Sequence, residues 1–141
     1  MASVFYDSFF RDMQNGSIDL DTDTIKGMLV TATYTPDRAT HAKRSDVTNE
    51  VTGTGYTAGG ATLAGKTVTA DTTNHRGVFD ADDLTWTGST ITARGIVLYK
   101  ARGGVATADE LIAYIDFGAN VISTAANFLV TWNAGGIFYF G

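Results

Sequence analysis

The sequence predicts a mostly β protein: an antiparallel sandwich of the jelly-roll or Greek-key type, with a short helix near the N-terminus. Composition favours strands joined by tight turns, because the 141 residues include 22 threonines and 16 glycines but a single proline. A further observation is the succession of short segments in which apolar and polar residues alternate, separated by turn-forming residues. The length suits one domain with a hydrophobic core of its own.

Residues Ser3–Asn15 are expected to form the helix, with Ser3 as its N-terminal cap. Phe5, Phe9 and Met13 recur at every fourth position, which gives the helix an apolar stripe. A short helix is marginal by itself, so this stripe must lie against something. It can pack on the protein's own sheet, or it can form an arm that docks onto a neighbouring subunit.

The rest of the chain reads as strands separated by polar or glycine-rich loops. The clearest hairpin is expected at Gly88-Ser89, a turn-forming pair between two alternating segments. Residues 1–16 are therefore interpreted as an arm and residues 17–141 as one β-sandwich domain, which we expect to stay folded without the arm. The expected strands are Ile18–Leu20, Ile25–Thr33, Lys66–Thr72, Val78–Thr87, Ile91–Lys100, Leu111–Phe117, Asn127–Trp132 and Ile137–Phe140.

Charge and cysteine content narrow the function. The formal net charge is −5 and no basic stripe is present, which disfavours direct binding to nucleic acid. The absence of cysteine excludes disulfides, thiol catalysis and cysteine-based metal sites. The N-terminal residues have neither the basic leader of a signal peptide nor an apolar run long enough for a membrane span.

One segment, Gly60–Thr67, matches the phosphate-binding pattern G-x-x-x-x-G-K-[ST]. That motif needs a buried strand before the loop and a helix after it, so that backbone N–H groups surround the phosphates. Here a polar glycine-rich stretch precedes the segment, and residues rich in β-branched side chains come after it. We expect no nucleotide hydrolysis. An enzyme remains an alternative, either a nucleotide hydrolase through Gly60–Thr67 or a hydrolase that uses carboxylates such as Asp80 and Asp82.

Other acidic and imidazole groups also fall short of a chemical site. Asp19, Asp21 and Asp23 resemble the start of a calcium loop, but the glycine and the bidentate glutamate of that loop are missing. The two histidines, His41 and His75, are isolated in polar segments. We therefore predict a protein that is not an enzyme and that uses no metal or other cofactor.

The C-terminal segment contains three consecutive aromatic residues, Phe138, Tyr139 and Phe140. In a strand these side chains point alternately to the two faces of the sheet. One face can fill the core, while the other needs a second sheet, the N-terminal helix or another subunit. The sequence leaves open whether this strand is internal or forms an interface.

Several segments together resemble a known family nearly end to end: FYDSFF (5–10), IDLDTDTIK (18–26), VTNEVTGTGYTAGG (47–60), DADDLTWTGSTITARG (80–95) and LIAYIDFG (111–118). The chain is similar to the cement, or decoration, proteins of tailed-bacteriophage heads. The resemblance implies a jelly-roll homodimer, made in the host cytoplasm, that binds the outer surface of the head. Its partner would be the major capsid protein, whose lattice it would stabilise.

Contacts with such a partner are expected from the N-terminal helix, from the polar excursion at residues 36–46 and from residues 53–60 of the glycine-rich loop. An alternative is a tail-associated module that binds a receptor or glycan, a role that β-sandwiches often serve with aromatic and acidic loop residues. The candidate partner-binding residues are Phe5, Phe9, Phe10, Arg38, Lys43, Arg44, Gly55 and Tyr56.

Overall fold

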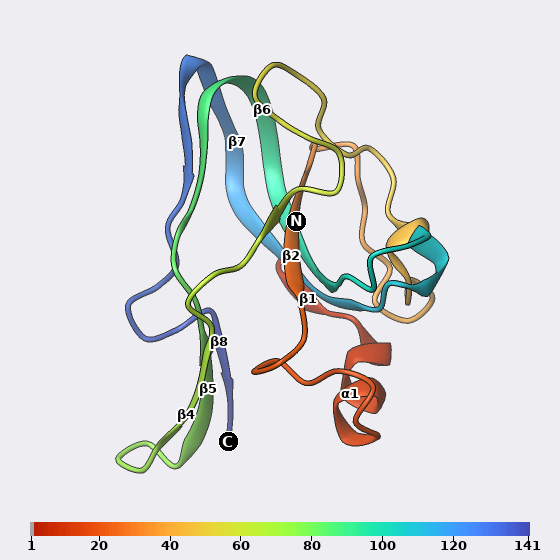
Figure 1. Cartoon of the computed structure of the whole chain (residues 1–141), viewed down its shortest axis with the longest axis vertical. Coiled ribbons are helices and arrows are strands. Elements are labelled where there is room, and N and C mark those ends of the chain that lie inside the picture. The colour runs from red at the N-terminus through yellow and green to blue at the C-terminus, as the bar shows by residue number, and fades with distance from the viewer. Residues whose placement is uncertain (1) are drawn as a thin grey trace.

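The protein is a mostly β, antiparallel sandwich with one short α-helix near its N-terminus, as a computed structural model describing residues 2–141 shows (Figure 1). A five-stranded sheet has the order β1-β7-β6-β2-β3, and a three-stranded sheet has the order β4-β5-β8. The predicted fold class is thereby confirmed at the level of the sandwich. The elements are β1 (Val4–Phe5), α1 (Asp7–Gln14), β2 (Ile25–Val30), η1 (Arg44–Asp46), β3 (Ala61–Thr62), β4 (Thr67–Asp71), β5 (Arg76–Asp80), β6 (Leu84–Lys100), η2 (Ala106–Ala108), β7 (Leu111–Val130) and β8 (Phe138–Phe140).

The helix is shorter than the sequence predicted, because its first expected turn is strand β1. Val4 pairs with Tyr114 and Phe5 with Ala113 on the edge of β7. The backbone N–H of Asp116 donates to the Ser3 hydroxyl at 2.9 Å, so Ser3 supports this strand pairing and does not cap the helix. Tertiary pairing has thus overridden the local helical pattern over the first residues of the segment.

The predicted hairpin at Gly88-Ser89 is wrong. Strand β6 bends at this pair but does not fold back on itself: both of its halves pair with β7, and Gly88 adopts a positive φ of 57° within a region of shifted register. Ser89 is fully buried, and its hydroxyl hydrogen-bonds the Ser123 hydroxyl at 2.8 Å. The glycine therefore serves a bulge, which is the other common use of an isolated glycine in a strand.

Strand β7 likewise joins segments that the sequence separated, since Leu111–Phe117 and Asn127–Trp132 fall largely within one 20-residue strand. Four register shifts interrupt its pairing with β6, and bulges of this kind bend and twist paired strands. The two strands consequently run as an arch, seen in blue and green in Figure 1, from the five-stranded sheet toward the three-stranded one.

The main core lies between the sheets and includes the N-terminal helix. Phe9 is fully buried there, and its ring lies 6.0 Å from that of Phe138 on β8. A second buried cluster, on the opposite face of the five-stranded sheet, contains Tyr6, Tyr34 and Tyr114. The helix stripe thus packs on the protein's own sheets, which decides in favour of the first of the two possibilities that the sequence left open.

The remaining segments match the expectations in part. The first expected strand, Ile18–Leu20, is not a strand, and the second ends at Val30 instead of Thr33. The excursion at residues 36–46 is irregular apart from the short helix η1. In β8, Phe138 faces the core whereas Tyr139 is 53% exposed, so the C-terminal strand has one buried and one open side.

Candidate docking surfaces

The aromatic candidates of the N-terminal segment pack against the phenylalanine rings of the C-terminal strand β8. Phe5 lies 5.1 Å from both Phe138 and Phe140 between ring centroids, and Phe10 lies 6.2 Å from Phe140. Phe5 and Phe10 are half-buried, whereas Phe9 is completely buried. Phe9 therefore has no exposed surface that a partner could contact, and Phe5 and Phe10 are only partly accessible.

The three basic candidates all form ion pairs within the chain. Arg38 contacts Asp7 at 2.8 Å on the surface. Arg44 contacts the buried Asp109 at 2.7 Å, and Lys43 lies 3.5 Å from the buried Glu110. Buried carboxylates need such partners, so Lys43 and Arg44 serve first to hold the 36–46 excursion against the loop between β6 and β7.

Gly55 and Tyr56 lie where the glycine-rich loop crosses β6. A side chain at Gly55 would meet the Ser89 backbone at 2.9 Å, so glycine lets the loop approach the strand closely. The Tyr56 hydroxyl donates to Glu50 at 2.7 Å and accepts from the Leu29 N–H at 3.0 Å. Burial, together with the hydrogen bond to Glu50, raises the pKa of Tyr56 well above its usual range. Both residues thus anchor the loop to the fold.

The segments that resemble a phosphate-binding loop and a calcium loop do not have the structural context that those motifs require. Gly60–Thr67 runs through β3 and a turn into β4, so the loop leads into a strand where a phosphate-binding loop would lead into a helix. Asp19 accepts hydrogen bonds from the backbone N–H groups of Asp21 and Thr22, and Asp23 contacts Lys100 at 2.8 Å. No group of three or more potential metal-ligating side chains occurs among residues 2–141.

The arch formed by β6 and β7 carries a surface without charge, which the sequence reasoning missed. No charged side chain occurs from Leu84 to Ala93 or from Phe117 to Gly141. On the outer side of the arch, Ile122 is 68% exposed and Leu129 is 59% exposed. We call this the uncharged hairpin surface; its exposed side chains are Thr85, Thr87, Thr90, Thr92, Ile122, Thr124, Asn127 and Leu129.

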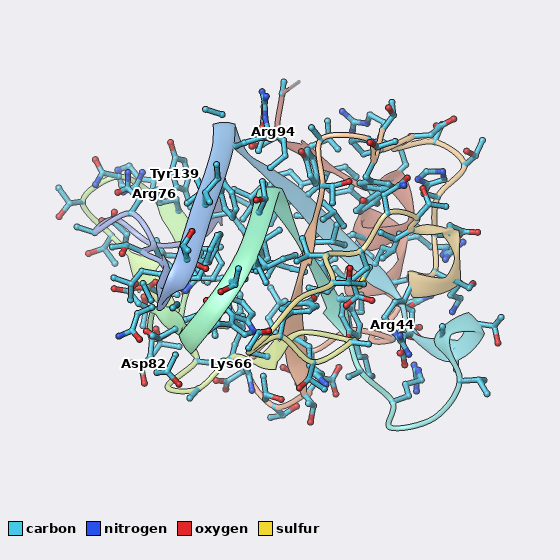
Figure 2. All side chains as sticks on the ribbon, turned by 90° about the horizontal axis from the view of Figure 1, so that it is seen from above. Arg44, Lys66, Arg76, Asp82, Arg94 and Tyr139 are labelled. Carbon is cyan, nitrogen blue, oxygen red and sulfur yellow. The ribbon has the colours of Figure 1, made fainter. Side chains whose placement is uncertain are left out.

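The register explains why these side chains share one side of the arch. Thr85 pairs with Leu129 and Thr92 with Ile122, whereas the neighbouring pairs Trp86–Phe128 and Ile91–Ser123 point into the core. Figure 2 looks onto the arch from above, and the labelled charged side chains lie toward the periphery of that view. The signal available in the sequence was the long stretch without charge, which periodicity analysis does not examine.

An ion pair lies at the end of the uncharged hairpin surface, where the uncharged stretch of β6 stops. Arg94 contacts Asp116 at 2.7 Å, and their side chains are 26% and 7% exposed. The hydrogen bond from Arg94 lowers the pKa of Asp116 to about 2. Asp116 also accepts the Gly118 N–H at 3.0 Å, which fixes the start of the irregular stretch opposite Arg94. The two charges at this end of the arch are thus paired with each other.

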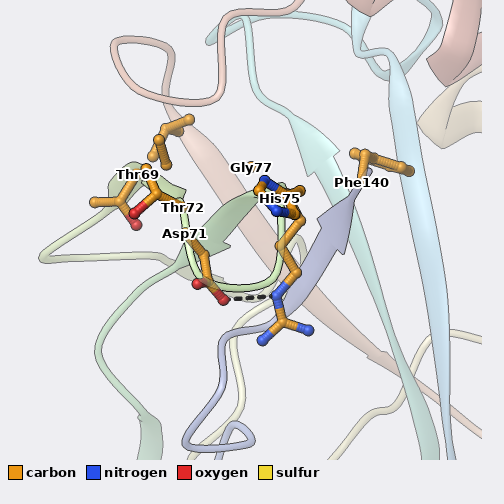
Figure 3. Close-up of a pocket in the computed structure, with 9 residues that line it drawn as sticks. Thr69, Asp71, Thr72, His75, Gly77 and Phe140 are labelled. Atoms are coloured by element: carbon orange, nitrogen blue, oxygen red, sulfur yellow. Dashed lines mark hydrogen bonds and ion pairs between the residues drawn. The ribbon is translucent and has the colours of Figure 1, made fainter.

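The three-stranded sheet provides a second open surface (Figure 3). One face of this sheet packs on the core through Phe79, but part of the same face lies beyond the core and stays uncovered. Val68 is 50% exposed there, and Ala70 and Gly77 are also exposed. With Phe140 these residues line a shallow hollow, which we call the β4 shelf. At its end Asp71 contacts Arg76 at 2.9 Å, and hydrogen bonds from Asn74 and then Arg76 hold the pKa of Asp71 below its usual range.

Comparison with known proteins adds no further information. The chain matches no protein-family model, no curated protein and no solved structure. Within residues 2–141, no helix combines the length and hydrophobicity that crossing a bilayer requires. The candidate site therefore rests on the two surfaces themselves.

Proposed function

We propose that this chain is a structural protein of a tailed-phage virion, a cement or decoration protein that binds the outer surface of the head. It would contact the major capsid protein and stabilise its lattice. The observation that carries the proposal is the uncharged hairpin surface, with Ile122 and Leu129 at its most exposed positions. The family resemblance of the sequence supports the choice of a phage head as the assembly.

An uncharged, partly apolar strand surface is prone to associate with other chains. Natural proteins protect exposed strands with charged side chains, because an uncharged open edge recruits other chains. Beyond the short pairing with β1, the outer edge of β7 has no strand partner within residues 2–141. A surface left in this condition is suited to burial in an assembly, and many copies on a lattice need only modest individual affinity.

The proposal is tested by placing charge on the uncharged hairpin surface. The double variant Ile122→Lys/Leu129→Lys is mixed with undecorated heads of the phage that encodes the chain, and the bound protein is measured after sedimentation. We expect its affinity to fall roughly tenfold or more, since central apolar contacts dominate interface energies. The thermal midpoint should change little, because both side chains already face solvent.

Val105→Lys is the matched control, because Val105 is as exposed as Ile122, at 68%, but lies beside η2. It should bind heads like the wild type. Undiminished binding by the double variant would exclude the uncharged hairpin surface as the contact. Wild-type protein that does not bind the heads at all would refute the proposed function.

A further inference from the structure

Asn15 is the only one of the six asparagines in the chain that is followed by glycine. It is the C-terminal cap of α1, and both Asn15 and Gly16 are exposed. Gly16 has a positive φ of 79°, and apart from its chain neighbours no atom lies within 4 Å of the position that a Cβ would occupy. The peptide bond after Asn15 is therefore sterically open, so the Gly16 nitrogen can approach the asparagine side chain.

The hydrogen bonds around this pair leave its reactive atoms available. The Ser17 N–H donates to Asn15 Oδ1 at 2.9 Å, which draws electron density away from the side-chain carbonyl carbon. The Gly16 N–H has no hydrogen-bond acceptor among residues 2–141. The carbon is thus polarised for attack, and the neighbouring nitrogen is free to attack it.

One rotation separates the folded geometry from a reaction between these atoms. The ψ angle of Asn15 is 3°, which holds the Gly16 nitrogen away from the side-chain carbon, so this angle must change first. The last turn of a helix opens readily, and glycine has no side chain that would hinder the rotation. The reaction therefore needs local opening at the end of α1 and not unfolding of the sandwich.

We propose that Asn15 is a site of spontaneous covalent modification, in which its side-chain amide is converted into a carboxylate. The Gly16 nitrogen loses its proton to solvent base and attacks Cγ of Asn15, forming a new C–N bond. The bond from Cγ to the amide nitrogen breaks, ammonia leaves, and a cyclic succinimide remains. Water then opens the ring at either carbonyl group and gives aspartate or isoaspartate.

Conversion changes how α1 ends. Either product places a negative charge beside the C-terminal carbonyl groups of the helix, where the helix dipole disfavours it. Isoaspartate also adds a carbon to the backbone ahead of the buried Ile18, whose N–H donates to the Asp12 carbonyl at 3.0 Å. Because α1 contributes Phe9 to the main core, conversion should lower the stability of the fold.

Asn133 provides an internal control. It is exposed, and its Oδ1 accepts the Gly135 N–H at 2.8 Å, in the same kind of turn as at Asn15. The next residue is Ala134, however, whose Cβ crowds the approach of its backbone nitrogen to the asparagine side chain. Asn133 should therefore persist under conditions that convert Asn15.

Peptide mapping by mass spectrometry tests the proposal on purified full-length protein that is incubated for weeks at mildly alkaline pH. Most copies should carry an acid in place of the amide at Asn15, and an isoaspartate-specific methyltransferase should label the same peptide. Asn15→Gln should remove that label, because glutamine would have to form a larger ring. Ala134→Gly should make Asn133 convert as well. Persistence of Asn15, or equal conversion of Asn133 in the wild type, would overturn the proposal.

The consequence for stability is measured by thermal unfolding followed by circular dichroism. Asn15→Asp should melt roughly 1–5 °C below the wild type, and incubated wild-type protein should melt below its fresh sample. Asn15→Gln should keep its own midpoint through the incubation. Equal midpoints before and after conversion of the wild type would contradict the expected destabilisation. The inference does not rest on the proposed function, because it concerns the free chain alone.

Discussion

At the scale of single residues, the basic side chains predicted to contact a partner form ion pairs within the chain. Arg44 neutralises Asp109, and Lys43 shares Glu110 with Arg102; these two carboxylates are 2% and 4% exposed. An unpaired carboxylate at such burial would be costly, so Arg44 cannot leave Asp109 for a partner without penalty.

The ion pair between Arg94 and Asp116 gives a prediction on pH. The hydrogen bond from Arg94 holds the pKa of Asp116 at about 2 in the folded chain, below the ordinary 3.8. Its stabilising contribution should therefore be fully present above about pH 4 and be lost as the pH falls toward about 2. At neutral pH, Asp116→Asn should lower the free energy of unfolding by about 1–3 kcal/mol.

Urea denaturation at a series of pH values checks this expectation. The difference in free energy of unfolding between wild type and Asp116→Asn should shrink through the acid range. Asp21→Asn, an exposed loop substitution, supplies the comparison. A difference that stays constant down to pH 2 would show that the ion pair does not account for the effect.

At the scale of elements, the glycine-rich loop is held by close backbone approach to β2 and β6. Gly59 accepts a hydrogen bond from the Tyr99 hydroxyl at 2.6 Å, and Gly60 lies against the Gly27 carbonyl. Gly60 has a positive φ of 79°, and an added side chain there would collide with that carbonyl. The loop is thus a packed part of the sandwich, although its composition resembles that of a flexible linker.

Comparing Gly60→Ala with Gly16→Ala separates the cost of backbone strain at positive φ from the cost of the steric clash. Gly16 has the same φ of 79° but nothing within 4 Å of the added carbon. Gly16→Ala should cost about 1–2 kcal/mol from backbone strain alone. Gly60→Ala should cost a further 1–3 kcal/mol, roughly, from overpacking. Unfolding free energies in urea measure both, and equal losses would argue against the close packing of the loop.

At the scale of the whole molecule, the arch of β6 and β7 connects the two sheets and separates the two open surfaces. The uncharged hairpin surface lies on the arch, whereas the β4 edge ends the three-stranded sheet (Figure 1).

The N-terminal segment belongs to this whole, which changes the expectation that residues 17–141 stay folded without it. Tyr6 and Phe9 are both fully buried, and loss of one buried phenylalanine typically costs about 3–5 kcal/mol. Deletion of residues 1–16 should therefore abolish or greatly weaken the cooperative thermal transition followed by circular dichroism. Gln14→Ala, an exposed change in the same helix, should not. Retention of the full-length midpoint by the truncated chain would restore the idea of an independent arm.

Much of the architecture could be predicted from local pattern. Threonine content and alternating polarity predicted an antiparallel β protein, and the spacing of Phe9 and Met13 predicted a helix near the N-terminus. These features are local, because strand and helix periodicity can be read within a few neighbouring residues. The same locality explains the error at Gly88-Ser89, where a bulge and a turn use the same residue types.

The sequence by itself determined the β class, the absence of cysteine chemistry and the stretches without charge. Only the tertiary structure decided that Ile122 and Leu129 share an exposed side, because their common direction depends on the register shifts between β6 and β7. Likewise, only the sheet order left β4 with an open edge. Pairings between residues distant in sequence set both surfaces, and no local pattern specifies such pairings.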